Sequence, residues 1–290
     1  MKLIILVLHL FVCNVAFSFE IADDENNTVI FKKTAKRIIS LSPHATELLY
    51  KAGATNQILA TVSYSDYPEA AKSLPRIGSY KKIDLESVIK LKPDLIVAWK
   101  SSGSLDQVNE LERLGYKIYF SEPKDFKGIA DNLNKFGRIL GTENIATERA
   151  NSFLNELNTL KLTYKNLKPV SVFYQVWNNP LMTINKDHLI TNVIELCGGR
   201  NVFGDLFARA PRVNIESVIL KDPQTIIIGM SENREGWVKE WHKWDVLRAV
   251  KEKHVYTVNA DYIVRQGPRV LKGAKKVCEI LESVRNHDKK

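Results

Sequence analysis

Aromatic rings with a shared placement are the residues of this sequence that best suit a ligand site. They fall just past predicted strands or in the loops between predicted units, and they are Tyr64, Tyr80, Trp99 and Trp177. Asp261 and Arg265 occupy the equivalent loop after the last predicted strand, 255–258. Flat apolar faces with a few polar groups suit a large, rigid organic ligand better than a bare ion. A single loop aromatic commonly covers a core, so the shared placement is what predicts a binding site.

The turn Ser42-Pro43-His44 leads from the first predicted strand, 37–41, into the first predicted helix. Open α/β sheets bind ligands at the carboxyl ends of their strands, which is where this turn lies. A histidine at a helix start more often has a structural or solvated role than a binding role. We therefore take Ser42, Pro43 and His44 as candidate ligand contacts, with a structural His44 as the alternative.

Motifs for catalysis and metal binding are missing from the sequence. It has no G-x-S-x-G elbow, no glycine-rich phosphate loop and no H-E-x-x-H. An exported hydrolase would use Ser42 and His44, but two positions apart at a helix start they do not readily face each other, and no acidic third member is indicated. The other histidines are dispersed without metal-ligand spacing. The sequence therefore predicts a non-enzymatic protein without a metal site or a cofactor.

The elements that position these residues come from a unit that occurs twice. A short apolar helix, a proline and an aliphatic strand occupy 83–99 and return 130 positions later, at 213–229. Asp84 and Asn214 are good N-caps for the two helices. The proline then ends each helix, and the strand that follows has the continuous apolar run of a strand buried on both faces. A duplicated α/β unit is the simplest explanation.

Alternation of strand and helix throughout the chain indicates mainly parallel sheets. A second, weaker similarity supports the duplication. Residues 46–53 and 192–199 each have the pattern of an apolar helix that ends at a glycine. The sequence therefore predicts an α/β protein with two similar lobes, bridged by one long rigid α-helix, and with a ligand cleft between the lobes. A rigid helix permits only small relative motion of the lobes. The predicted parts are a signal peptide (1–18), a loose leader (19–35), an N-terminal lobe (36–125), a helical connector (126–167) and a C-terminal lobe (168–290).

The N-terminal residues have the order of a secretory signal. A basic start is followed by the apolar run 3–12 and by small residues at 16–18. The run is too short for a comfortable membrane span, and an uncleaved anchor is the alternative. We expect a cleaved signal and an exported mature protein.

Removal of the signal takes Cys13 with it and leaves Cys197 and Cys278. Both lie on apolar helix faces, which places them in the core of the second lobe. An oxidising compartment favours a disulfide between two such cysteines, and two unpaired core thiols are the alternative.

The formal net charge of +9 could suit nucleic acid or an anionic membrane surface. The lysines are scattered, however, and no nucleic-acid motif accompanies them. We interpret the charge as a solvated surface and expect no nucleic-acid partner.

Glu86 and Glu216 occupy the first helical turn in the two copies of the repeated unit. The helix dipole stabilises a carboxylate there, and for one copy that role would suffice. Because the two glutamates occupy equivalent positions in the two lobes, they would present two negative charges on one face of the molecule. Such a pair suits docking onto arginines of a two-fold symmetric partner.

Several segments together carry a family resemblance. They are RIISLSP with TE (37–47), YSDYP (64–68), LE with KPDLIVAW (85–99), ELCGGRNVF (195–203) and the stretch 261–269. They resemble the periplasmic cobalamin-binding (BtuF-like) proteins of ABC importers over nearly the whole mature chain. The broader group includes binders of iron siderophores and haem, and shares two α/β lobes bridged by a long helix.

The resemblance implies that Tyr64, Tyr80 and Trp99 contact a corrin from the first lobe, and that Asp261 and Arg265 contact it from the second. It also implies a monomeric protein with no cofactor besides the transported ligand. Glu86 and Glu216 would dock onto the transmembrane permease subunits of an ABC importer. Cys197 and Cys278 would form a disulfide that the family shares.

The chain departs from the family pattern at three places. Ala210 stands where the best-known members have a tryptophan, Tyr80 replaces a tryptophan, and Val176-Trp177 replaces a segment containing phenylalanine. The resemblance implies cobalamin or a related corrinoid as the ligand, with a ferric siderophore or haem as the alternative. A siderophore site would usually need more cationic groups than Arg265 alone.

Overall fold

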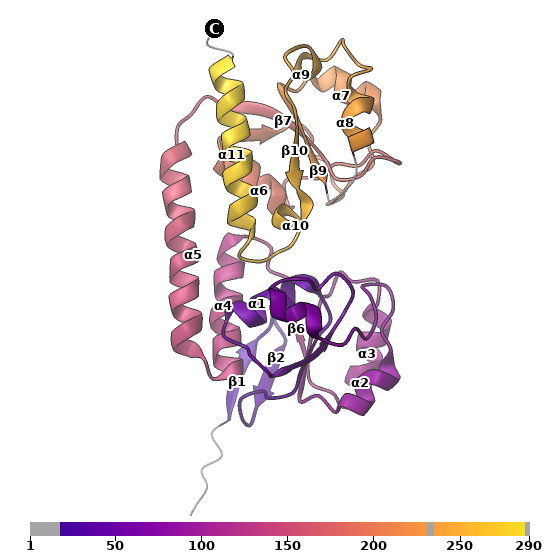
Figure 1. The fold of residues 1–290 in the computed structure, drawn as a ribbon, viewed down its shortest axis with the longest axis vertical. Helices are drawn as coiled ribbons and strands as arrows, with labels where there is room; N and C mark the ends of the chain where they lie inside the picture. The colour runs from indigo at the N-terminus through magenta and orange to yellow at the C-terminus, as the bar shows by residue number, and fades with distance from the viewer. Residues whose placement is uncertain (1–17, 231–234, 288–290) are drawn as a thin grey trace, which may run out of the picture.

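The computed structural model describes residues 18–230 and 235–287, which form two α/β lobes with one long helix beside both (Figure 1). The predicted signal peptide lies outside the described residues except for Ser18. The sheet of the first lobe contains β3 (Ile38–Ser40), β4 (Ile58–Thr61), β5 (Leu95–Ala98) and β6 (Ile118–Phe120). The sheet of the second lobe contains β7 (Val170–Gln175), β8 (Gly199–Asn201), β9 (Thr225–Met230) and β10 (Val255–Asn259).

The two sheets have the same topology. The strand order is β4-β3-β5-β6 in the first lobe and β10-β9-β7-β8 in the second. When the strands are numbered along the chain within each lobe, both sheets have the order 2-1-3-4. Every pairing in the two sheets is parallel. The prediction of two similar lobes with parallel sheets is confirmed.

The repeated unit forms α2 (Leu85–Leu91) before β5 and α7 (Ile215–Lys221) before β9. As predicted, Asp84 and Asn214 cap these helices, since their side chains accept hydrogen bonds from the amides of Ser87 and Ser217 at 3.1 and 2.9 Å. The residues that end both helices, Lys92 and Asp222, adopt the left-handed conformation. The two helices therefore begin and end in the same way in the two lobes.

The remaining helices cover the two sheets. Those of the first lobe are α1 (Pro43–Lys51), the 3₁₀ helix η1 (Glu69–Ser73) and α3 (Leu105–Arg113). Those of the second lobe are α6 (Leu189–Leu196), α8 (Glu235–Trp241), α9 (Arg248–Lys251), α10 (Ala260–Ile263) and α11 (Val270–His287). Of the helices described, none is both long enough and apolar enough to cross a membrane.

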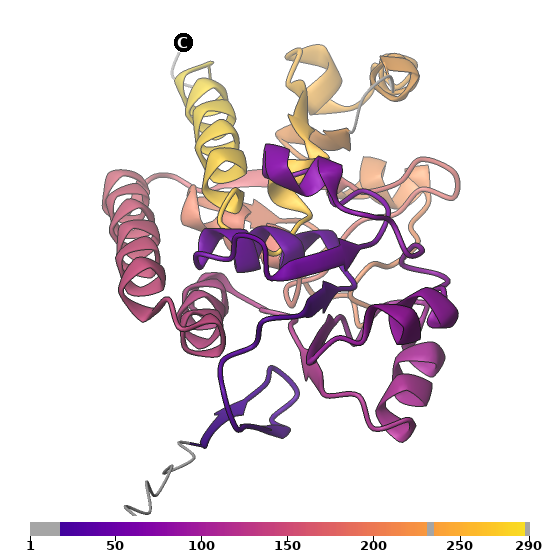
Figure 2. The same cartoon turned by 60° about the horizontal axis from the view of Figure 1, so that its bottom comes forward.

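Two antiparallel helices link the lobes. α4 (Phe126–Leu140) packs against α1 and against α5 (Glu143–Tyr164), and α5 also contacts α6 and α11 of the second lobe. Figures 1 and 2 show α4, α5 and α11 together on one flank of the molecule. The long helix thus runs past both lobes, whereas α4 packs on the first.

The prediction of a loose leader at 19–35 is wrong. This segment forms an antiparallel hairpin of β1 (Phe19–Ala22) and β2 (Thr28–Phe31). Its apolar side chains Ile21, Val29 and Phe31 are buried in the core. Acidic residues interrupt the apolar alternation of this segment in the sequence. One of them, Asp23, has a structural role, because its carboxylate accepts hydrogen bonds from backbone amides of the turn.

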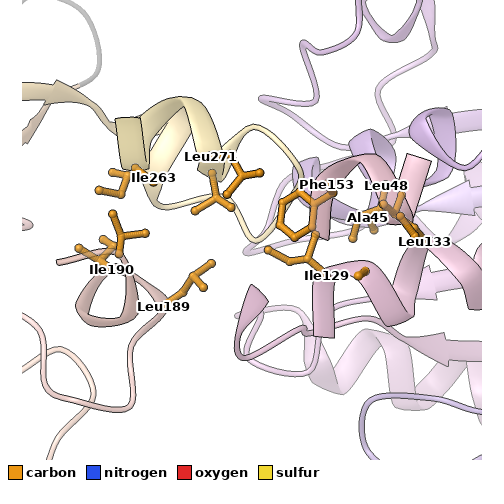
Figure 3. Packing of buried hydrophobic residues seen from close by; sticks show 14 of the residues in the cluster. Ala45, Leu48, Ile129, Leu133, Phe153, Leu189, Ile190, Ile263 and Leu271 are labelled. Atoms are coloured by element: carbon orange, nitrogen blue, oxygen red, sulfur yellow. The ribbon is translucent and has the colours of Figure 1, made fainter. Parts of the chain in front are cut away.

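One apolar core extends through both lobes. It contains residues of α1 and α4 from the first lobe, Phe153 of α5, and residues of α6, α10 and α11 from the second lobe. Figure 3 shows this continuity from Ala45 and Leu48 through Ile129 and Phe153 to Leu271 and on to α6. The opposite face of each sheet packs into a smaller core of its own lobe. The shared core fixes the lobes against each other on the α5 side.

The predicted disulfide is present. Cys197, at the end of α6, is bonded to Cys278 of α11. Both residues are fully buried in the shared core. The bridge joins parts of the second lobe that are 81 positions apart.

Candidate functional site

The carboxyl ends of the strands in the two lobes face each other. Because the strands of each sheet are parallel, their carboxyl ends lie along one edge, where open α/β sheets bind ligands. Asp66, beyond β4, accepts hydrogen bonds from Arg265, beyond β10, at 2.5 and 3.3 Å. Glu122, beyond β6, pairs with Arg209, beyond β8, at 3.2 Å. We call the loops at these two edges the interlobe face.

Arg265 is a fixed positive charge on the interlobe face. Its side chain is 12% exposed and also pairs with Asp261 at 2.9 Å. Burial alone would lower the pKa of Arg265, but the hydrogen bond to Asp66 and the charge of Asp261 more than offset it, so the pKa is raised. The pKa of Asp66 is lowered, because the Arg265 partner outweighs the effect of burial. Arg265 is therefore charged, and its charge is already matched by carboxylates.

Trp99 forms part of the first-lobe side of this face. The residue follows β5, its ring is partly exposed, and its edge-on neighbour is His44 at a centroid distance of 5.8 Å. The indole Nε1 is buried and has no hydrogen-bond partner among the described residues. Ser101, two positions further along this loop, is held by Glu122 through its amide and its hydroxyl. The Glu122–Arg209 pair thus anchors the Trp99 loop to the second lobe.

Ser42 and His44 have structural contacts behind this ring. The His44 Nε2–H donates to the carbonyl oxygen of Ser121 at 2.8 Å, and burial lowers the pKa of the imidazole, which favours its neutral form. The Ser42 hydroxyl caps α1 by accepting from the Ala45 amide at 3.3 Å. Both residues are buried, whereas Pro43 is partly exposed. His44 is therefore buried behind the Trp99 ring and bonded to the backbone, which are the contacts expected of a structural residue.

The other predicted aromatics are exposed on loops of the interlobe face. Tyr64 lies two positions before Asp66 and has a positive φ of 67°, a conformation that concentrates at functional sites. The loop of Tyr80 packs against Gly103, beyond β5. Trp177 follows β7, packs edge-on against Trp237, and donates through Nε1 to the Asn179 carbonyl oxygen at 3.0 Å. The three rings therefore have solvent-facing surface that a ligand could cover.

Phe207 is an aromatic residue of this face that sequence analysis missed. Its relative exposure is 102%, in the β8–α7 loop that also carries Arg209. The loop is well fixed, because the buried Asn185 amide donates to the carbonyl oxygens of Leu206 and Phe207 at 3.1 and 3.3 Å. A phenylalanine that is fully exposed on a fixed loop offers its whole ring to a flat apolar ligand. The irregular loop gave no periodicity that could have identified it.

Glu86 and Glu216 lie on a different surface. Both side chains are exposed in the first turns of α2 and α7. Figure 1 shows α2 and α7 on the same flank, opposite the flank of α5. The apolar residues Ile89 and Leu220 on these helices are also exposed. The two carboxylates therefore occur at equivalent places in the two lobes, each with one exposed apolar residue on the same helix.

Comparison with known proteins identifies the family. The sequence model of a periplasmic binding protein family matches residues 38–262. The chain belongs to this periplasmic binding protein family. Membership places it in the periplasm and among binding proteins, as predicted, and argues against the hydrolase alternative.

The relatives of this periplasmic binding protein include several with a named ligand. It is 38% identical over 250 residues to the vitamin B12-binding protein of Vibrio vulnificus strain YJ016, which covers 86% of this chain and 91% of the relative. The corresponding protein of Vibrio cholerae strain M66-2 is 36% identical, over 86% of this chain and 90% of the relative. The crystal structure of the periplasmic vitamin B12-binding protein BtuF of Vibrio cholerae superposes with a TM-score of 0.80, at 35% identity over 87% of this chain and 98% of that chain.

The fold is also shared with proteins of much lower sequence identity. A periplasmic haem-binding protein, BhuT, superposes with a TM-score of 0.75 at 16% identity, over 87% of this chain and 99% of that chain. At that identity the similarity establishes a shared fold.

Proposed function

We propose that this protein captures cobalamin, or a closely related corrinoid, in the periplasm and delivers it to an ABC importer of the inner membrane. The observation that carries the proposal is the pair of facing strand edges with exposed aromatic rings. Relatives at 36–38% identity are named as vitamin B12-binding proteins, which supports the same ligand. A large flat ligand buried between such rings gains apolar contact on both faces.

The charges of the interlobe face favour a corrinoid over an anionic siderophore. A ferric siderophore needs unpaired cationic groups. Arg209 and Arg265, which pair across the interlobe face, are already matched by the carboxylates of Glu122, Asp66 and Asp261. We assign ligand contact to the partly or fully exposed residues of the face, which are Pro43, Tyr64, Tyr80, Trp99, Trp177, Phe207, Asp261 and Arg265.

A calorimetric titration with cobalamin, haem and a ferric siderophore tests this proposal. We expect one-to-one binding of cobalamin and much weaker binding of the other two. Preference for haem or for the siderophore, with no heat on adding cobalamin, would contradict the assignment.

Two substitutions test the aromatic contacts. We expect Trp99→Ala and Phe207→Ala each to weaken cobalamin binding by roughly 1–3 kcal/mol, because each removes most of an apolar ring from the contact. Phe207 is fully exposed, so its loss leaves the folded core intact. Calorimetry measures the affinity, and thermal melting of the Trp99 variant checks its folding.

Trp244→Ala is the matched control for these variants. Trp244 is a partly exposed tryptophan of the α8–α9 connection and is not among the proposed contacts. Its loss should leave affinity unchanged. Unchanged affinity in the Phe207 and Trp99 variants would show instead that the rings only cover the lobe cores.

The docking part of the proposal rests on Glu86 and Glu216. We expect the double variant Glu86→Lys/Glu216→Lys to lose uptake in cells while it keeps its affinity for cobalamin. Reversed charge opposite arginines of the permease costs several kcal/mol, which lowers docking affinity tenfold or more. Ligand affinity persists because both helices lie away from the interlobe face.

Glu148→Lys/Glu279→Lys is the matched control for docking. It makes the same change of charge at exposed positions of α5 and α11, on the opposite flank (Figure 1). Uptake should be normal in this control. Normal uptake by a well-expressed Glu86/Glu216 variant would mean that the two glutamates only stabilise their helix starts.

The maturation of the chain completes the proposal. We infer cleavage after Ser18, since β1 begins at Phe19 and packs in the first lobe. The mature protein would act as a monomer. Intact mass and size-exclusion measurements on the exported protein test both statements.

A further inference from the structure

Three side chains at the outer end of the second lobe bring together the donor atoms of a metal site. Glu252 follows α9, His254 precedes β10, and His287 is the last residue of α11. One donor atom from each side chain lies within 4.8 Å of the other two. Figure 1 shows α9 and the C-terminal end of α11 at the end of the second lobe that is away from the first. The cluster is therefore remote from the interlobe face.

The donor set matches a transition metal. Two imidazoles and one carboxylate, with a water in the fourth position, form a recurrent zinc site. Hard cations such as Mg²⁺ and Ca²⁺ prefer shells made of oxygen atoms, so two nitrogen donors select against them. Zn²⁺ has no geometric preference of its own and accepts the tetrahedral shell that three protein ligands and a water supply.

The distances are close to those of a bound shell. Ligands about 2.0–2.1 Å from a tetrahedral ion lie roughly 3.3–3.5 Å from one another. His254 Nδ1 and Glu252 Oε2 are already 3.4 Å apart. The His287 ring is edge-on to His254 at a centroid distance of 5.0 Å. His287 is exposed in the last helical turn, so a side-chain rotation can bring its nitrogen into the shell.

The surroundings hold the ligands in place. His254 is 3% exposed and stacks on Tyr256. The other carboxylate oxygen of Glu252, Oε1, accepts a hydrogen bond from Arg248 Nε at 3.0 Å, an outer-shell contact that orients the carboxylate. Glu252 Oε2 is buried, and apart from His254 Nδ1 at 3.4 Å, which also lies 3.3 Å from the Gln224 carbonyl oxygen, it has no polar partner among the described residues. A buried carboxylate oxygen without a hydrogen bond is costly, and a bound cation would satisfy it.

We propose that Glu252, His254 and His287 bind one Zn²⁺ ion that ties the end of α11 to the start of β10. The spacing of the two histidines predicts no metal site, because they are far apart along the chain and lack the spacing of a metal motif. The fold places them side by side. The ion would clamp the final helix, which contributes buried residues along most of its length to the core shared by the lobes.

A calorimetric titration of the metal-free protein with ZnCl₂ tests the proposal. The protein is purified without a polyhistidine tag, which would itself bind zinc. We expect one Zn²⁺ per chain, with affinity unchanged by excess Mg²⁺. His287→Ala should weaken zinc binding more than tenfold, because it removes one of three protein ligands. Glu252→Gln should weaken it as well, because the amide carries no charge.

The matched control is His242→Ala, which removes an exposed histidine outside the cluster. This variant should bind zinc like the wild type. Since His242 and His287 are both exposed, neither change disturbs the core. A thermal melt is the second readout, and saturating zinc should raise the Tm of the wild type but not that of His287→Ala.

Two results would overturn the proposal. One is zinc affinity in His287→Ala equal to that of the wild type, which would place any bound ion elsewhere. The other is an equal loss of affinity in His242→Ala, which would indicate non-specific binding to surface histidines.

Discussion

Replacing Arg269 by alanine is expected to lower the free energy of unfolding by about 3–5 kcal/mol, since it leaves a buried carboxylate without its partner. The partner is Glu47 of α1, which is 1% exposed. Its two oxygens accept from the Arg269 amide at 3.2 Å and from Nε at 2.8 Å. The Arg269 guanidinium also lies over the Tyr67 ring, 4.0 Å from its centroid. The pair joins the two lobes beside the interlobe face.

The double variant Glu47→Gln/Arg269→Met is the control for this prediction. It removes both charges while keeping similar side-chain volumes, so most of the lost stability should return. Urea denaturation of the single and double variants measures the difference. Equal stability of Arg269→Ala and the wild type would show that water reaches Glu47 and screens its charge.

The same pair predicts a dependence of stability on pH. Burial raises the pKa of Glu47 above its usual value of 4.5, and Arg269 offsets this only in part. Between the usual and the raised pKa the folded protein binds more protons than the unfolded chain, so stability falls as the pH rises through this window. Arg269→Ala should extend the fall to higher pH, and Glu47→Gln should abolish this contribution.

Removing the disulfide is the second large effect. We expect Cys197→Ala/Cys278→Ala to lower the free energy of unfolding by about 2–5 kcal/mol, because the unfolded chain gains freedom when a long loop is no longer closed. The cross-linked positions are 81 residues apart, which places the effect toward the upper end of that range. Urea denaturation under non-reducing conditions measures it.

Thiol labelling provides the control for the disulfide. The mature wild-type protein, unfolded without reductant, should show no free cysteine. Quantitative labelling of Cys197 and Cys278 would mean that the exported protein carries two core thiols. An unchanged midpoint in the double variant would mean that the bridge adds nothing to folding.

The repeated unit explains why the sequence predicts the fold so well. Local signals, namely the caps Asp84 and Asn214 and the prolines after α2 and α7, recur with their strands at one constant spacing. Duplication then implies two lobes, and parallel strands imply the edge where loops gather. The hairpin at 19–31 was missed because its strands are four residues long and its turn is acidic.

The candidate site was predictable only in part, because much of it depends on contacts between distant residues. Trp99 and Arg265 follow regular strands, so their position could be inferred. The pairing of Arg209 with Glu122 and the exposure of Phe207 depend on how irregular loops of two lobes meet. The cluster of His254 and His287 likewise joins a strand start to a helix end. Residue spacing in the sequence does not predict contacts between segments that are so far apart along the chain.

The shared core makes the order of synthesis matter for folding. Leu271 and Cys278 belong to α11, the last helix, yet they pack in the same core as α1 and α4 of the first lobe. A chain that emerges N-terminus first therefore cannot complete the core of its first half until its final residues have appeared. The two lobes should consequently fold and unfold as one cooperative unit rather than as independent domains. A truncation that removed α11 would leave the first lobe with exposed apolar surface as well as the second.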